Sequence, residues 1–278
     1  MARANRDVGV RVSPAGIERM ASAARTIRDC RRDLALRGED PLGELITGGA
    51  AICDWRHYPD GEVYDPQSHA QYFFHAHPAD SRSSPERGHF HTFLRAEGMP
   101  AGVAPLLLPE LAIPEAAPAR PQAAPLKRGA RAEVSHLVAI SIDGRGEPIR
   151  LFTTNRWVTA ETWYRAEDVI RMLDCFVINE AAPAEVLNRW IGAVLQLFRP
   201  QIANLLRARD ETVMAWRRRR RTHVFEDPRL EVTSSLDVNL DAQLEFIDEV
   251  RFSSGADALP TMPGLPTMAE GWEAGQAG

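Results

Sequence analysis

The spacing of apolar residues predicts helices near both ends of the chain. The pair Ser13-Pro14 is typical of a helix start, and apolar residues recur at helical spacing from 14 to 37, as far as Gly38. The same periodicity predicts further helices over 160–176, 183–199, 200–216 and 241–250.

Extended segments rich in aromatic and β-branched residues occupy the middle of the chain. They predict strands over 71–77, 89–94, 136–142 and 148–153, and a short strand over 229–236. The sequence Asp143 to Gly146 predicts a hairpin turn, and Pro59-Asp60-Gly61 predicts a tight turn in the polar segment 54–65. We therefore expect an α+β fold, with a central, mostly antiparallel sheet flanked by the N-terminal and C-terminal helices.

Changes in composition along the chain suggest its domain organisation. Proline and alanine dominate an insert at about 97–131, and such a stretch supplies neither a sheet ladder nor a regular helix. We expect a single α+β domain over residues 1–252, in which the insert is an extended loop or a lid over a site. Glycine, proline and alanine dominate 253–278, for which we expect a disordered tail.

Composition narrows the setting in which the protein works. The net charge of −5 gives no global attraction to nucleic acid. No apolar run approaches the roughly 20 residues that span a bilayer, and the N-terminus lacks the apolar core of a signal peptide. Cys30, Cys53 and Cys175 form no CxxC motif. We expect a reduced, cytoplasmic protein without a membrane partner.

Two HxH pairs, His75 with His77 and His89 with His91, lie close together in the sequence. Side chains two residues apart on a strand point to one face, so each pair presents two imidazoles in one direction. An antiparallel hairpin with its loop from Pro78 to Gly88 would place His75 opposite His91 and His77 opposite His89. Neutral imidazole is the commonest protein ligand for transition metals. Such a patch suits one metal with a spare ligand, or a close pair of metals.

We therefore predict a transition metal ion, Fe, Cu, Zn or Mn, held by these four histidines, with His136 as an additional ligand. Glu62 and Asp65 could supply a carboxylate ligand or a general base. Arg156 follows the strand 148–153 and could hold a carboxylate or phosphate of a small-molecule substrate. The alternatives are a hydrogen-bonded histidine ladder without metal, and an Arg156 that packs on a neighbouring tryptophan.

The arginine run from Arg217 to Arg221 supports a competing hypothesis. It lies where a long helix is expected to end, a position at which the helix dipole favours cations. No aromatic residues interleave with the run to stack bases, so we expect no nucleic-acid partner. The competing function is a metal-free binding or regulatory module that uses this run and the long helices. The apolar faces of those helices could also pack in a homodimer.

Motifs for other chemistries are missing from the sequence. The chain contains no GxSxG elbow, no GxxxxGK[ST] loop and no GxGxxG. The segments HYPDGEVYD, YFFHAHP, GHFHTFLR and LFTTNRWVT resemble an uncharacterised bacterial family of unknown function, across about residues 15–250. That resemblance implies no activity. The functional prediction therefore rests on the residues themselves: a metal-dependent enzyme, either an oxidoreductase or oxygenase, or a hydrolase.

Overall fold

The computed structural model describes residues 10–43, 45–46, 52–78, 85–108, 134–180, 184–220, 223–253, 261–262 and 267–268. Most of the expected insert and most of the expected tail lie outside these residues. The domain boundaries given above therefore stay a prediction.

Helices and short turns of 3-10 helix make up much of the described chain. The helices are α1 (Pro14–Arg37), α2 (Arg156–Thr159), α3 (Ala166–Met172), α4 (Glu185–Leu197), α5 (Arg199–Arg220) and α6 (Leu240–Ser253). The 3-10 turns are η2 (Ala96–Gly98), η4 (Leu173–Cys175) and η5 (Val224–Glu226). Within the described part of the chain, each helix is too short or too polar to cross a bilayer.

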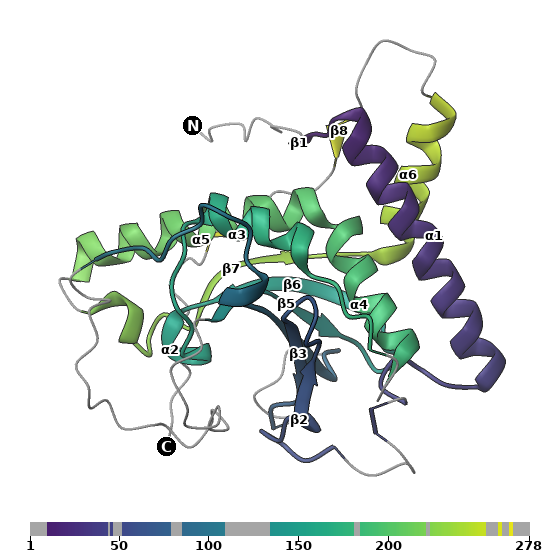
Figure 1. The fold of residues 1–278 in the computed structure, drawn as a ribbon, viewed down its shortest axis with the longest axis horizontal. Coiled ribbons are helices and arrows are strands. Elements are labelled where there is room, and N and C mark those ends of the chain that lie inside the picture. Colours follow the sequence, from purple (N-terminus) through teal and green to yellow (C-terminus); the bar gives the residue numbers. More distant parts are fainter. Residues whose placement is uncertain are drawn as a thin grey trace, which may run out of the picture.

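The strands are β1 (Val10–Arg11), β2 (Tyr58–Tyr64), β3 (Ala70–His75), β4 (Gly88–Arg95), β5 (Val134–Ile142), β6 (Pro148–Thr154), β7 (Val232–Asp237), β8 (Thr261–Met262) and β9 (Thr267–Met268). One sheet has the order β2-β3-β4-β5-β6-β7-β9, and all its neighbouring strands are antiparallel. Helices from the N-terminal and C-terminal sides flank it (Figure 1). The expected α+β fold is therefore confirmed.

The prediction of a helix over 160–176 is wrong for its first part. Tyr164 instead forms a β-bridge with Pro105, and the Leu106 amide donates to the Trp163 carbonyl. Because these backbone groups bond to another segment, they cannot bond within a helix. The helix α3 begins only at Ala166, whose amide donates to the Asp210 carboxylate at 2.7 Å.

The polar segment 54–65 forms an edge strand where the sequence predicts a tight turn. In β2, Tyr58 and Val63 both pair with β3, but the register changes between them. Gly61 at φ 87° and Glu62 at φ 63° accommodate the additional residues of β2. A proline and an irregular ladder are tolerated because β2 lies at the edge of the sheet.

One face of the sheet packs against the helices. Figure 1 shows α3, α4 and α5 lying along the sheet, with α1 and α6 side by side at one end. Tyr72, Phe74 and Phe90 are buried on this face in the main hydrophobic core. Trp190 of α4 contacts the Phe90 ring, and the Tyr72 hydroxyl donates to the Asn188 side chain at 2.5 Å. Each such large buried side chain contributes roughly 1.5–3 kcal/mol to stability.

The same packing sets the register between β3 and β4. Phe74 lies directly opposite Phe90, and their ring centroids are 5.2 Å apart. Gly88, the first residue of β4, lies close to Phe74 and to the backbone of His75. A Cβ atom at position 88 would be 2.6 Å from the His75 carbonyl oxygen and would also contact the Phe74 ring. A residue without a side chain is therefore required at this point.

Replacing Gly88 by alanine should lower the free energy of unfolding by about 1–3 kcal/mol, because the neighbouring backbone must move to admit the methyl group. Urea denaturation followed by circular dichroism measures this loss. Gly144→Ala is the matched control, since nothing lies within 4 Å of a Cβ there. Equal stability of the two variants would contradict the proposed close packing at Gly88.

Candidate metal centre

The histidines of the HxH pairs that belong to β3 and β4 lie on the face of the sheet opposite the helices. Alternation along β3 and β4 places His75, His89 and His91 there together, with His75 directly opposite His89. The predicted pairing of His75 with His91 and of His77 with His89 is therefore wrong. The strands are offset by an even number of residues from that prediction, because the buried aromatic side chains set the register. An even offset leaves each side chain on its predicted face.

His136 reaches the same face because of an irregularity in β5. Thr92 of β4 pairs with Val138, but its neighbour Phe93 pairs with His136, so Leu137 is an extra residue in the ladder. Both Leu137 and Val138 are buried in the main hydrophobic core. Without the extra residue, His136 would point toward the helices. The expectation that His136 could reach the histidine patch is confirmed by its contact with His91.

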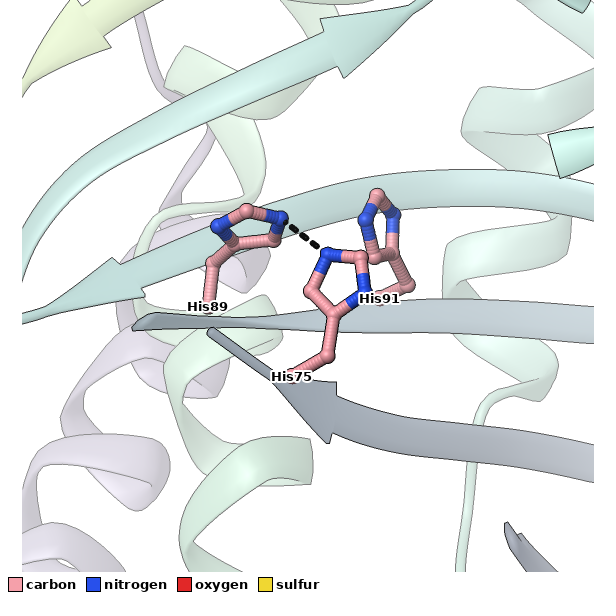
Figure 2. Close-up of side chains that lie close together, drawn as sticks. All are labelled: His75, His89 and His91. Carbon is pink, nitrogen blue, oxygen red and sulfur yellow. Dashed lines mark hydrogen bonds between the residues drawn. The ribbon is translucent and has the colours of Figure 1, made fainter. Parts of the chain in front are cut away.

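Three of the imidazoles converge, as Figure 2 shows: those of His75, His89 and His91, with ligand nitrogens all within 4.8 Å of one another. Their ring centroids are 4.5–5.1 Å apart, and the Nε2 atoms of His75 and His89 are separated by 2.6 Å. Imidazoles that share one metal, each bound at about 2.0–2.1 Å, have nitrogens roughly 3 Å apart. Small side-chain rotations would therefore bring all three nitrogens to one ion. We call these residues the histidine triad.

Two triad members have a partner at Nδ1. The Nδ1 atom of His89 lies 2.8 Å from Glu86 Oε1, and the other oxygen of Glu86 accepts from Arg150 at 2.9 Å. The Nδ1 atom of His91 lies 3.0 Å from His136 Nε2. On its far side, His136 Nδ1 lies 3.4 Å from the Thr154 hydroxyl. His136 therefore contacts a triad member, but it does not belong to the group of converging ligand atoms.

Burial keeps several of these rings neutral. It lowers the pKa of His75 and of His91 well below 6.5, and the neighbouring imidazoles lower both values further. Burial, with the charge of Arg209, lowers the pKa of His136 to about 3. For Glu86, burial raises the pKa, but the hydrogen bond with His89 and nearby positive charge bring it below its ordinary value. The neutral imidazole is the form that binds a metal ion.

The site is more accessible on the β3 side than at its centre. His75 and His77 are half-buried, whereas His89 and His91 are buried. The His77 ring lies 5.1 Å from the rings of both His75 and His89, so His77 flanks the triad. Trp55, which is 41% exposed, packs on His77 at 4.3 Å. Among the described residues of the cluster, the more exposed ones are therefore His75 and His77, with Trp55 beside them.

Glu62, a predicted catalytic carboxylate, contacts the site through His57. Its Oε1 atom lies 3.1 Å from His57 Nδ1, and its Oε2 atom accepts from the Gln71 amide. The His57 ring stacks on Phe73 at 3.7 Å and lies 5.6 Å from the His75 ring. Glu62 is thus separated from the triad by one imidazole.

Asp65 occupies a turn and bonds to the backbone. Its carboxylate accepts from the amides of Gln67, Ser68 and Asn179, at 2.6–2.9 Å. Burial raises the pKa of Asp65, but the amide donors together outweigh burial, and the pKa lies below its ordinary value. These bonds join the turn between β2 and β3 to the segment before α4, which is a structural role.

Arg156, the predicted substrate anchor, bonds to protein groups. Its guanidinium forms an ion pair with Glu226 and donates from Nε to the Glu161 carbonyl at 3.1 Å. The preceding residue, Asn155, caps α2 by accepting from the Arg156 amide. Glu161 is itself buried, and burial raises the pKa of its carboxyl to about 7.

Sequence reasoning missed the contribution of β6 to this face. Phe152 packs against His89 and His91, at 5.1 and 6.2 Å between ring centroids. Arg150, two residues earlier, stacks on Phe152 and bonds to Glu86. The period-two alternation of 150, 152 and 154 in β6 was the available signal. It could not indicate which of the two sets of side chains faces the histidines.

The fold and the cluster define the class: an α+β protein with a histidine-lined face on its antiparallel sheet. The family profile of the Domain of unknown function DUF6969 matches residues 21–238, and the chain belongs to that family. The resemblance to an uncharacterised family is thereby confirmed. Searches of curated proteins and of solved structures each found no match.

In metal-free protein, acid should destabilise the wild type more steeply than the His136→Gln variant. An unfolded chain protonates His136 near pH 6.5, whereas the folded protein does so only near 3. Between these values the unfolded state holds an extra proton. For this one group, each unit by which the pH is lowered therefore decreases the stability by about 1.4 kcal/mol.

Urea unfolding in the presence of a chelator, between about pH 5 and 7.5, measures this slope. Glu161, with its pKa raised to about 7, shifts stability in the opposite direction across part of this range. Glu161 is present in both proteins, so the difference between their curves reports His136 together with its effect on the pKa of His91. Parallel curves would show that His136 is not held in its neutral form.

Proposed function

We propose that this protein is a metal-dependent enzyme whose catalytic metal is held by His75, His89 and His91. The observation that carries the proposal is the convergence of their ligand nitrogens, all within 4.8 Å, on one face of the sheet. Three imidazoles form a good donor set for a transition metal and a poor one for Mg²⁺ or Ca²⁺, which prefer oxygen. We therefore infer Fe, Cu, Zn or Mn.

The number of ligands supports catalysis over a structural role. Structural zinc sites have four protein ligands, whereas catalytic sites have three and keep one position for water or substrate. The triad is half-buried on the His75 side only, so a small-molecule substrate would approach there, past His77. His77, whose ring lies 5.1 Å from the rings of both His75 and His89, would be a ligand for a second ion beside the first.

The bound metal would supply Lewis-acid or redox chemistry, which makes the enzyme a hydrolase or an oxidoreductase of the oxygenase type. Glu62 would act through His57, whose ring is fixed by the carboxylate on one side and by Phe73 on another. Such a pair can hold or move a proton beside the triad. Asp65 and Arg156 have no part in this proposal, because protein groups already engage both.

The competing function is a metal-free binding module built on the arginine run. The last turn of α5 contains Arg217 to Arg220, of which Arg218, Arg219 and Arg220 are exposed; Arg221 lies outside the described residues. Arg220 stacks on Trp216 at 5.1 Å, a cation–π contact within α5 that requires no partner molecule. Replacing the exposed arginines by glutamine would leave metal content unchanged if the enzyme proposal is correct.

Elemental analysis of the natively purified protein tests the proposal. We expect about one equivalent of a single transition metal per chain, or two if His77 helps to bind a second ion. Replacing His75, His89 or His91 by alanine should in each case remove most of the metal, because a site with two imidazoles binds far more weakly.

His69→Asn is the matched control for these variants. His69 hydrogen-bonds to the Tyr64 hydroxyl and is not among the triad residues. Its backbone has φ 61°, a conformation that asparagine tolerates better than alanine. This variant should keep its metal. Wild-type protein that remains metal-free after reconstitution would refute the proposed function and favour the binding module.

A further inference from the structure

The bonds around Glu86 extend the site beyond its ligands. We propose that Glu86, held in place by Arg150, is a positioning residue that fixes the tautomer of His89 so that its Nε2 atom faces the metal. The inference rests on the proposed metal site for its function. The tautomer itself exists in the metal-free protein and can be tested there.

The hydrogen bonds determine where the proton of His89 lies. A carboxylate can only accept, so the 2.8 Å bond between Glu86 Oε1 and His89 Nδ1 requires the proton on Nδ1. A neutral ring then carries a lone pair on Nε2. That atom points at His75 Nε2, 2.6 Å away, in the direction of the triad (Figure 2). His89 is therefore preset as an Nε2 ligand.

Arg150 holds the carboxylate in this orientation. Its Nη2 atom donates to Glu86 Oε2 at 2.9 Å, which leaves Oε1 for His89. The guanidinium is itself fixed, because it stacks on Phe152 at 4.9 Å and its Nε atom lies 3.4 Å from the Ser141 hydroxyl. The Phe152 ring also packs edge-on against His89. The imidazole is thus held by a carboxylate at one edge and by an aromatic ring beside it.

Burial makes this arrangement specific. The side chains of Glu86 and His89 are each 6% exposed, so water competes little for the bond between them. Both oxygens of Glu86 have protein partners, and neither belongs to the cluster of converging ligand atoms. Glu86 therefore acts on the metal through His89 and leaves an all-imidazole ligand set. Partners of this kind typically change metal affinity 10–100-fold when they are removed.

Nitrogen NMR of histidine-labelled, metal-free protein tests the tautomer. We expect His89, assigned with a His89→Gln variant, to carry its proton on Nδ1 in the wild type. In Glu86→Ala the ring should lose this preference, and zinc affinity measured by chelator competition should fall about 10–100-fold. Glu86→Gln restores an oxygen acceptor and should recover the tautomer, together with at least part of the affinity.

Arg87→Gln is the matched control, because Arg87 follows Glu86 directly and forms an ion pair with Asp40 at 2.9 Å. It should leave both the tautomer and the zinc affinity unchanged. A wild-type His89 protonated on Nε2, or an affinity in Glu86→Ala equal to that of the wild type, would overturn the positioning role.

Failure of the wild type to bind any metal would refute the proposed function. The tautomer result would still decide whether Glu86 orients His89. The two failures are therefore distinguishable.

Discussion

The packing of one face of the sheet against the helices is the constraint on which the rest of the structure depends. Phe74 and Phe90 face each other across β3 and β4 in the main core, and Gly88 admits the Phe74 ring. Because neighbouring side chains in a strand point to opposite faces, this packing turns His75 and His89 to the other side. The position of the candidate metal centre is thus a consequence of hydrophobic burial elsewhere.

Crowding several imidazoles on a buried face has an electrostatic consequence. A second positive charge would be costly beside the first, and burial already disfavours protonation, so the pKa values of His75 and His91 fall well below normal. Neutral rings then hydrogen-bond to one another, as His91 does with His136. The Nε2 atoms of His75 and His89 also face each other, and their separation of 2.6 Å is that of a hydrogen bond between two rings.

Two of the four non-glycine residues with positive φ in the described part of the chain lie on the β2 side of the site. Trp55 and Glu62 both have φ angles above 60°, in the left-handed region that large side chains rarely adopt. Trp55 packs on His77, and Glu62 binds His57. Each conformation costs of order 1–3 kcal/mol, which the surrounding structure has to offset. This edge of the sheet therefore combines local strain, solvent access and the side chains nearest to the proposed substrate path.

The sequence by itself determined the helix over 14–37, the strands that carry the histidines and the face they share, because apolar periodicity and alternation are local properties. It could not determine the register of β3 and β4, the extra residue at Leu137 that turns His136 inward, or the edge strand formed by the segment 54–65. Those features depend on how aromatic side chains far apart in the chain pack together. The engagement of Asp65 with backbone amides and of Glu86 with Arg150 was likewise decided by tertiary structure, since only folding brings such partners together.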